Sequence, residues 1–246
     1  MALDKTTRKL HEKEHIKEEE QDVIIRAKSF WDRSGKTITY VGSAIILIIA
    51  GWFLYNNFVK QPKEAKANDA VPLIQKTFAE FANAPSDSTK AQWATVCLNG
   101  DGTNLGAIKF ISKYSGTNAS NLCHYYAGAC YLYLKQFDNA IKQLKDFHTD
   151  ETVVKSRAYG MIGDAYSEFK KNDDALDYYK KAANVNEKDE YTSSEFLFRA
   201  ALFAETIGKK KEAIDLFKKI KENYPKTEKG NEVDRYLARL GEVNDL

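Results

Sequence analysis

One stretch of the sequence matches a catalytic zinc motif. His11, Glu12 and His15 fit the pattern H-E-x-x-H, in which two imidazoles one helical turn apart bind zinc and the glutamate acts as general base. A catalytic zinc also needs a third protein ligand and a cleft that excludes water. The surrounding residues, from Asp4 to Gln21, are a dense mixture of charges with almost nothing apolar. We therefore interpret the match as part of a solvated arm and expect no metal and no cofactor, with zinc hydrolysis as the alternative.

The other reactive side chains do not form a recognisable catalytic set. Cys123 and Cys130 are seven residues apart on one expected helix, about 10.5 Å along its axis and too far for a disulfide. We expect both to be small buried side chains, as is Cys97 unless it bridges to one of them. The sequence contains no Gly-rich phosphate loop, nucleophile elbow or convincing carboxylate pair. These observations predict that the protein is not an enzyme.

The charge balance argues against nucleic acid as a partner. The 246 residues include 37 Lys or Arg and 35 Asp or Glu, for a net charge of +2. Nucleic-acid-binding domains usually carry a clear basic excess. We therefore expect no nucleic-acid partner.

An apolar segment near the N-terminus is long enough to cross a membrane. Residues 37–59 contain no Asp, Glu, Lys, Arg or His, and Lys36 and Lys60 bound the run. As a helix these residues would span about 34 Å, more than a hydrocarbon layer of about 30 Å. The sequence predicts one transmembrane helix and hence contact with membrane lipid; a buried core helix and a cleaved signal peptide are the alternatives.

The N-terminal arm, 1–36, ends in an amphipathic stretch. Its apolar residues recur at three- and four-residue steps and would share one side of a helix: Val23, Ile24, Ala27, Phe30 and Trp31. Such a helix either lies on the bilayer surface or docks on a membrane partner. Within twenty residues of the apolar run, five basic residues precede it and four follow it, which weakly favours a cytoplasmic N-terminus.

Three similar units follow in the C-terminal half of the chain. In each, a small residue is followed by further apolar positions at offsets of 3, 12, 16 and 19, and the units recur after 35 and 38 residues. The units are Gly128, Tyr131, Ala140, Leu144 and Phe147; Gly163, Tyr166, Ala175, Tyr179 and Ala182; and Ala201, Ala204, Ala213, Phe217 and Ile220. Small residues allow two helices to approach closely, and a short polar turn divides each unit at the same place. The pattern predicts helical hairpins stacked in series.

This pattern resembles the tetratricopeptide repeat, a 34-residue helical hairpin, over about residues 119–229. Upstream, Leu73 to Ala82 and Leu105 to Tyr114 are similar to one or two degenerate repeats. Downstream, Val233, Tyr236, Leu237 and Leu240 predict a capping helix. The expected fold is all-α: a transmembrane helix, a linker over 60–72, a repeat domain over 73–229 forming an α-solenoid, and a capping helix within 230–246.

The resemblance implies a concave wall that binds segments of other proteins. Nine side chains on the first helices of the hairpins are expected to face this groove: Tyr125, Leu132, Tyr133, Arg157, Asp164, Glu168, Phe198, Leu202 and Glu205.

The overall arrangement resembles the YfgM-like family, the ancillary subunits of the bacterial SecYEG translocon. The matching features are residues 23–31 (VIIRAKSFW), Gly35 and Lys36, a single span from Thr37 and a C-terminal repeat domain. The resemblance implies an inner-membrane protein with periplasmic repeats. It also implies three kinds of partner: SecYEG, a membrane-anchored chaperone of the peptidyl-prolyl isomerase type, and newly exported proteins. A scaffold for another envelope or division complex, and an organelle import receptor with cytosolic repeats, are the alternatives.

Overall fold

The computed structural model describes residues 2–242, and side chains for 24–26, 28–37 and 39–242. The side chains of His11, Glu12, His15, Val23 and Ala27 therefore lie outside the described part. The chain divides into two units, Met1–Pro62 and Lys63–Leu246. The described residues form helices and no strand; one isolated antiparallel bridge joins Gly100 to Leu105. The expectation of an all-α chain is confirmed.

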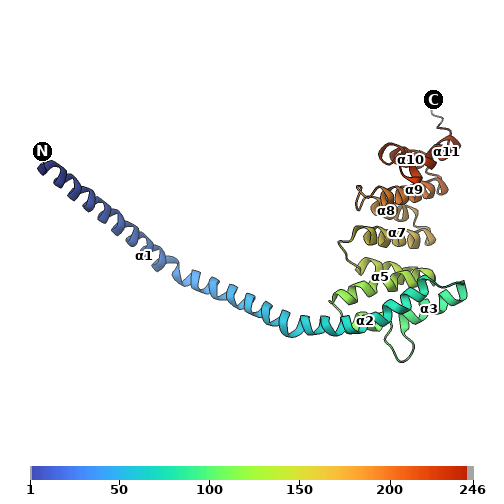
Figure 1. Cartoon of the computed structure of the whole chain (residues 1–246), viewed down its shortest axis with the longest axis horizontal. Helices are drawn as coiled ribbons and strands as arrows, with labels where there is room; N and C mark the ends of the chain where they lie inside the picture. The colour runs from blue at the N-terminus through green and yellow to red at the C-terminus, as the bar shows by residue number, and fades with distance from the viewer. Residues whose placement is uncertain (1, 243–246) are drawn as a thin grey trace. The chain divides into compact units, whose positions relative to one another are not determined.

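The first unit is dominated by the helix α1, Ala2–Tyr55, followed by the π-helical segment η1, Asn56–Lys60 (Figure 1). The helical stretch Thr39–Ala82 contains an 18-residue window with a mean hydropathy of 1.6, none of it buried. Large apolar side chains such as Leu47 and Ile48 are about 70% exposed. By its length and composition this helix can cross a membrane.

Helix α2, Gln61–Ala82, begins directly after the π-helical segment and includes most of the expected linker, 60–72. Ala67, Val71, Ile74 and Phe81 are buried in the second unit. These positions follow a helical period, so one face of α2 gains stability by packing although its first turn is polar. The four buried residues pack against helices that lie later in the sequence. The sequence of 60–72 alone does not show these contacts, so its polar residues suggested a linker.

The second unit continues with nine helices between residues 87 and 239, which Figure 1 shows stacked in chain order. They are α3 (Asp87–Asn99), α4 (Ala107–Lys113), α5 (Asn118–Tyr133), α6 (Phe137–Asp146), α7 (Thr152–Glu168), α8 (Asn172–Ala183), α9 (Glu190–Thr206), α10 (Lys210–Asn223) and α11 (Glu228–Arg239). The three hairpins expected from the repeats are α5–α6, α7–α8 and α9–α10. Helices α3 and α4 form a shorter pair before them.

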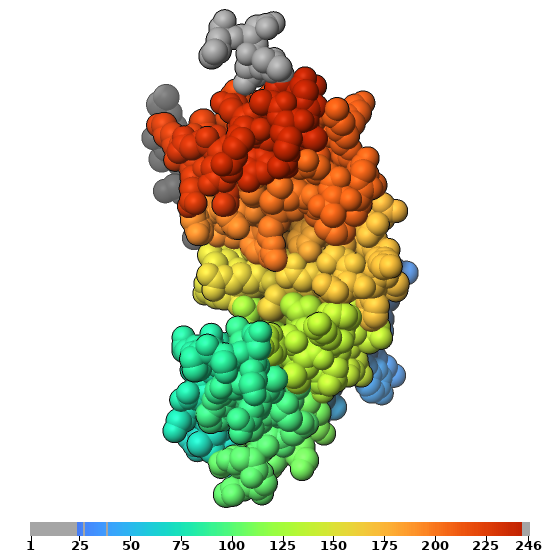
Figure 2. Space-filling model, turned by 90° about the vertical axis from the view of Figure 1, so that its right-hand side faces the viewer, coloured from blue at the N-terminus to red at the C-terminus, as the bar shows by residue number. Residues whose placement is uncertain are grey.

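The interior of the second unit consists of two large apolar clusters joined by a small one. The first lies among α2, α3, α4 and α5 and includes all three cysteines. The second runs from α8 to α11. Between them, Leu144, Ala158 and Ile162 connect the first hairpin to the second. Figure 2 shows the same order from the surface, with α2–α3 at one end of this unit and α10–α11 at the other.

Helix α11 closes the C-terminal end of the stack. Val233, Leu237 and Leu240 are buried, and Tyr236 stacks on Phe217 of α10 at a centroid distance of 5.3 Å. Its exposed side carries charged residues such as Arg235 and Arg239. The expected capping helix is therefore present, because an apolar face covers the last hairpin and a polar face meets solvent.

Candidate protein-binding surface

The hairpins are held together where the sequence places its small residues. A Cβ added at Gly128 would overlap the side chain of Leu144, and one at Gly163 would lie 2.7 Å from the ring of Tyr179. In the third hairpin, Ala201 has no exposed surface. The absence of larger side chains lets each first helix approach its partner closely. This fixes the orientation of α5, α7 and α9, which carry the nine expected groove residues.

The turn inside each hairpin contains a residue with left-handed backbone at the same repeat position. These residues are Lys135 (φ 58°), Lys170 (φ 55°) and Gly208 (φ 81°). The N–H of the following residue donates to a carbonyl five residues back in each case, as in Lys171 to Tyr166 at 3.0 Å. This hydrogen bond belongs to the Schellman motif, which ends an α-helix by satisfying its last carbonyls. The three turns are therefore structurally equivalent.

The structure packs two expected groove residues of α5 against α2. The ring of Tyr125 lies 6.3 Å from that of Phe78, and the ring of Tyr133 lies 5.5 Å from that of Phe81. The Tyr133 hydroxyl donates to the backbone oxygen of Asp87 at 3.0 Å. Part of this face of α5 is therefore occupied by the chain itself.

Leu132, the third expected groove residue of α5, is half-buried.

The expected groove residues of α7 separate into two exposed charges and one paired carboxylate. Arg157 and Glu168 are exposed. Asp164 accepts a hydrogen bond from the Tyr179 hydroxyl at 2.8 Å and forms an ion pair with Arg199 of α9 at 2.9 Å. Burial, followed by the Asp164 charge, raises the pKa of Tyr179 above its usual value. Asp164 therefore links two hairpins.

On α9, one expected groove residue belongs to the core. Phe198 is only 6% exposed and meets the ring of Tyr236 edge-on at 4.9 Å, because α11 covers it. Leu202 is half-buried at the edge of the same cluster. Glu205 pairs with Arg239 of α11. Phe198 is therefore more a part of the capping interface than of an open wall.

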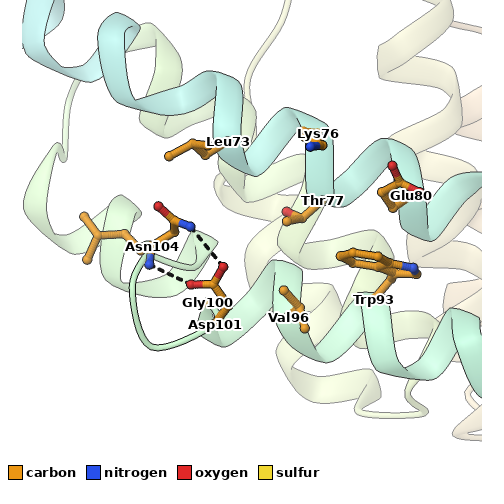
Figure 3. A pocket seen from close by; sticks show the side chains of 10 residues that line it. Leu73, Lys76, Thr77, Glu80, Trp93, Val96, Gly100, Asp101 and Asn104 are labelled. Atoms are coloured by element: carbon orange, nitrogen blue, oxygen red, sulfur yellow. Dashed lines mark hydrogen bonds between the residues drawn. The ribbon is translucent and has the colours of Figure 1, made fainter.

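Sequence reasoning missed a cleft between α2 and α3, shown in Figure 3. Its volume is about 170 Å³, and its lining includes Leu73, Lys76 and Glu80 from α2 and Trp93 from α3. Leu73 is 49% exposed. The volume is below the roughly 300 to 1,000 Å³ of most small-molecule sites, so the cleft has room for an apolar side chain of a partner.

A hydrogen-bonded loop lines one end of this cleft. The Asp101 carboxylate accepts from the backbone N–H of Thr103 at 3.0 Å and of Asn104 at 2.7 Å. These hydrogen bonds, those from Asn104 first, hold the pKa of Asp101 below its usual value. Gly100 has a φ of 85°, and a Cβ there would overlap the backbone of Asn104. The Asn99–Gly102 turn in the sequence was the available signal, but nothing local indicated that α2 would lie beside it.

A second cavity lies where the first and second hairpins meet. Its volume is about 390 Å³, and Phe147, Tyr159 and Tyr178 line it together with Lys145 and His148. The Lys145 ammonium lies 5.7 Å from the Tyr178 ring centroid. This junction is also where the apolar core is smallest, which explains why space remains between the hairpins.

His124 and the cysteines have structural surroundings. His124 is half-buried, and its Nδ1 lies 2.7 Å from Oε1 of Gln143. Cys97, Cys123 and Cys130 are free thiols without exposed surface. Burial raises the pKa of Cys123 to about 12. The expectation that the cysteines are small buried side chains is confirmed.

Comparison with known protein families agrees with this geometry. Two family models, both described as tetratricopeptide repeat, match residues 156–189 and 195–227. A search of curated proteins gives no match. The matched segments correspond to α7–α8 and α9–α10, and the preceding pair α5–α6 has the same left-handed turn. The chain therefore contains tetratricopeptide repeats, a type of helical repeat that binds other proteins.

Proposed function

We propose that this protein is a membrane-anchored tetratricopeptide repeat protein that binds other polypeptides and makes or breaks no covalent bond. The observation that carries the proposal is the stack of hairpins in which two matched repeats are followed by a capping helix. The apolar part of α1 supports the anchor, because its large side chains are exposed over a length that can span a bilayer.

The proposed partners follow from the resemblance to the YfgM-like family. Residues 37–59 would cross the bacterial inner membrane once, with the arm 1–36 in the cytoplasm and the repeats in the periplasm. The repeats would bind newly exported proteins beside SecYEG and act with a membrane-anchored chaperone of the peptidyl-prolyl isomerase type. Anchoring raises the effective concentration of the repeats near emerging chains, so that weak contacts suffice.

The exposed charges on α7 are the part of the expected groove most open to a partner. Arg157 and Glu168 are exposed and lie on a helix whose core positions are fixed by Gly163. Polar and charged groups at an interface contribute to specificity and to the association rate. A partner that contacts α7 should therefore respond to reversal of both charges.

Affinity purification from native membranes in mild detergent, followed by mass spectrometry, tests the proposed partners. We expect Sec components and the chaperone with the wild-type chain, and at least a severalfold loss with R157E/E168R. The matched control E222K/K226E also reverses two exposed charges and should leave recovery unchanged. Absence of Sec components under conditions that preserve the translocon would contradict the proposal, and recovery of division or envelope proteins instead would favour the scaffold alternative.

The anchor and its orientation need separate measurements. The protein should remain in membranes after alkaline carbonate extraction. The repeats should be protected from protease in intact cells and digested in spheroplasts whose outer membrane is open. Digestion only after lysis of the inner membrane would place the repeats in the cytoplasm.

A further inference from the structure

We propose that the start of α2 and the exposed side of α4 form a basic surface that docks on anionic lipid headgroups. This inference rests on the proposed membrane anchor and adds a second lipid contact, made by the repeat domain itself. It concerns the segments 63–66 and 107–118, which the structure brings together within the second unit.

Two hydrogen bonds hold these segments together. The Lys63 ammonium donates to the backbone oxygen of Ser115 at 2.8 Å. The Glu64 carboxylate accepts from the backbone N–H of Asn118 at 2.9 Å, at the first residue of α5. The turn between α4 and α5 is therefore fixed beside the first residues of α2.

Chain connectivity keeps this turn near the end of the apolar run. Lys63 follows Val59 by only four residues, and four residues span at most about 14 Å even when fully extended. The headgroup region on each side of a bilayer is roughly 5 to 8 Å thick, from the difference between total and hydrocarbon thickness. The bound holds for any orientation of the two units. Lys63 therefore lies no more than about 14 Å from the end of the apolar run, close enough for the turn that it contacts to reach the headgroup layer.

The charge of these segments suits an anionic surface. Segments 63–66 and 107–118 contain four basic residues, Lys63, Lys66, Lys109 and Lys113, and one acidic residue, Glu64. The Glu64 carboxylate accepts a hydrogen bond from the first residue of α5. The partial positive charge at this helix N-terminus offsets the negative charge of Glu64. Lys109 and Lys113 are exposed and one helical turn apart on α4, and the Lys113 ammonium lies 5.2 Å from the Tyr114 ring centroid.

The expected contribution of each lysine is measurable. A basic side chain close to an anionic membrane increases binding about fivefold, and the attraction falls off over a Debye length of about 8 Å at physiological salt. Removing the charges of Lys109 and Lys113 should reduce the ratio of docked to undocked repeat domain by about 25-fold. The membrane helix should stay inserted, because hydrophobic burial holds it.

Fluorescence quenching in nanodiscs tests the proposal on the full-length chain. A fluorophore is attached at S115C, where labelling is selective because Cys97, Cys123 and Cys130 are buried. The substitution preserves the bond from Lys63, which is to a backbone oxygen. Nitroxide-labelled headgroups then report how close the turn is to the bilayer.

We expect stronger quenching in nanodiscs containing phosphatidylglycerol than in pure phosphatidylcholine. The variant K109Q/K113Q should lower quenching toward the phosphatidylcholine level, as should high salt. The control K210Q/K211Q removes two exposed charges from the first turn of α10 and should leave quenching unchanged.

Two outcomes would overturn the inference in different ways. Equal quenching in both lipids, or no effect of K109Q/K113Q while the chain stays in the nanodisc, would refute the basic docking surface alone. Extraction of the chain from liposomes by alkaline carbonate would refute the anchor, and the inference would fall with it.

Discussion

The left-handed turn residues provide a test of how backbone strain is distributed among the repeats. Lys170 has a φ of 55°, whereas Gly208 at the equivalent place has a φ of 81°. A left-handed conformation costs an L-residue about 1 to 2 kcal/mol. Glycine avoids this cost but loses about 0.4 to 1 kcal/mol through the greater entropy of its unfolded chain. We expect Lys170→Gly to raise the free energy of unfolding by about 0.5 to 1 kcal/mol.

The reverse substitution should lower stability by a similar amount. A Cβ added at Gly208 meets no atom within 4 Å, so Gly208→Ala changes only the backbone energy of the turn. For a unit of this size, 1 kcal/mol corresponds to roughly 2 to 4 °C in the unfolding midpoint. Urea and thermal unfolding followed by far-UV circular dichroism can resolve such shifts.

The control Lys170→Ala separates the backbone from the side chain. It removes the lysine side chain while keeping a Cβ, so the left-handed cost remains and the midpoint should change little. If Lys170→Ala stabilised the protein as much as Lys170→Gly, the side chain and not the dihedral angle would be responsible. A destabilised Lys170→Gly or a neutral Gly208→Ala would refute the reasoning.

Three further predictions concern packing, capping and thiol ionisation. Gly163→Ala should destabilise the second hairpin by about 1 to 3 kcal/mol, because its Cβ would lie 2.7 Å from the Tyr179 ring. Urea unfolding measures this loss. Unchanged stability would mean that the ring can move aside. Glu64→Ala should lower the free energy of unfolding by about 0.5 to 2 kcal/mol, because it removes the acceptor of the Asn118 N–H. Glu64→Gln keeps an acceptor oxygen and should lower it less. Equal losses in the two variants would contradict this. The pKa of Cys123 is about 12 in the folded protein against a usual 9.0, so unfolding between these pH values releases a proton. The free energy of unfolding should therefore fall by up to about 1.4 kcal/mol per pH unit in this range. Cys123→Ala should flatten this part of the pH profile.

The repeats could be predicted from the sequence because their defining contacts are local. Gly128 meets Leu144 only 16 residues later, and Gly163 meets Tyr179 at the same separation. A contact that recurs at a fixed short distance leaves a periodic pattern. The left-handed residues were harder to recognise, because two of the three are lysines and only Gly208 has the residue type that usually marks such a turn.

The structure of α2 could not be predicted in the same way, because its partners are distant in the sequence. Phe78 stacks on Tyr126 at 4.2 Å, and Glu64 reaches Asn118 across more than 50 residues. Seen alone, residues 60–72 are polar enough to suggest a linker. The burial of Ala67 and Val71 follows only from the fold of the later helices.

The same long-range contacts determine which parts of the expected groove remain open. Helix α2 packs on the aromatic face of α5, and α11 buries Phe198 on α9, so the chain covers part of its inner surface at both ends. The middle helix α7 keeps Arg157 and Glu168 exposed. A partner bound there would meet charged side chains more than aromatic ones, and exposed charges are screened by salt. Recovery of partners should therefore decrease as ionic strength rises. Recovery that is insensitive to salt would instead indicate binding through apolar side chains, such as Trp93 and Leu73 in the cleft between α2 and α3.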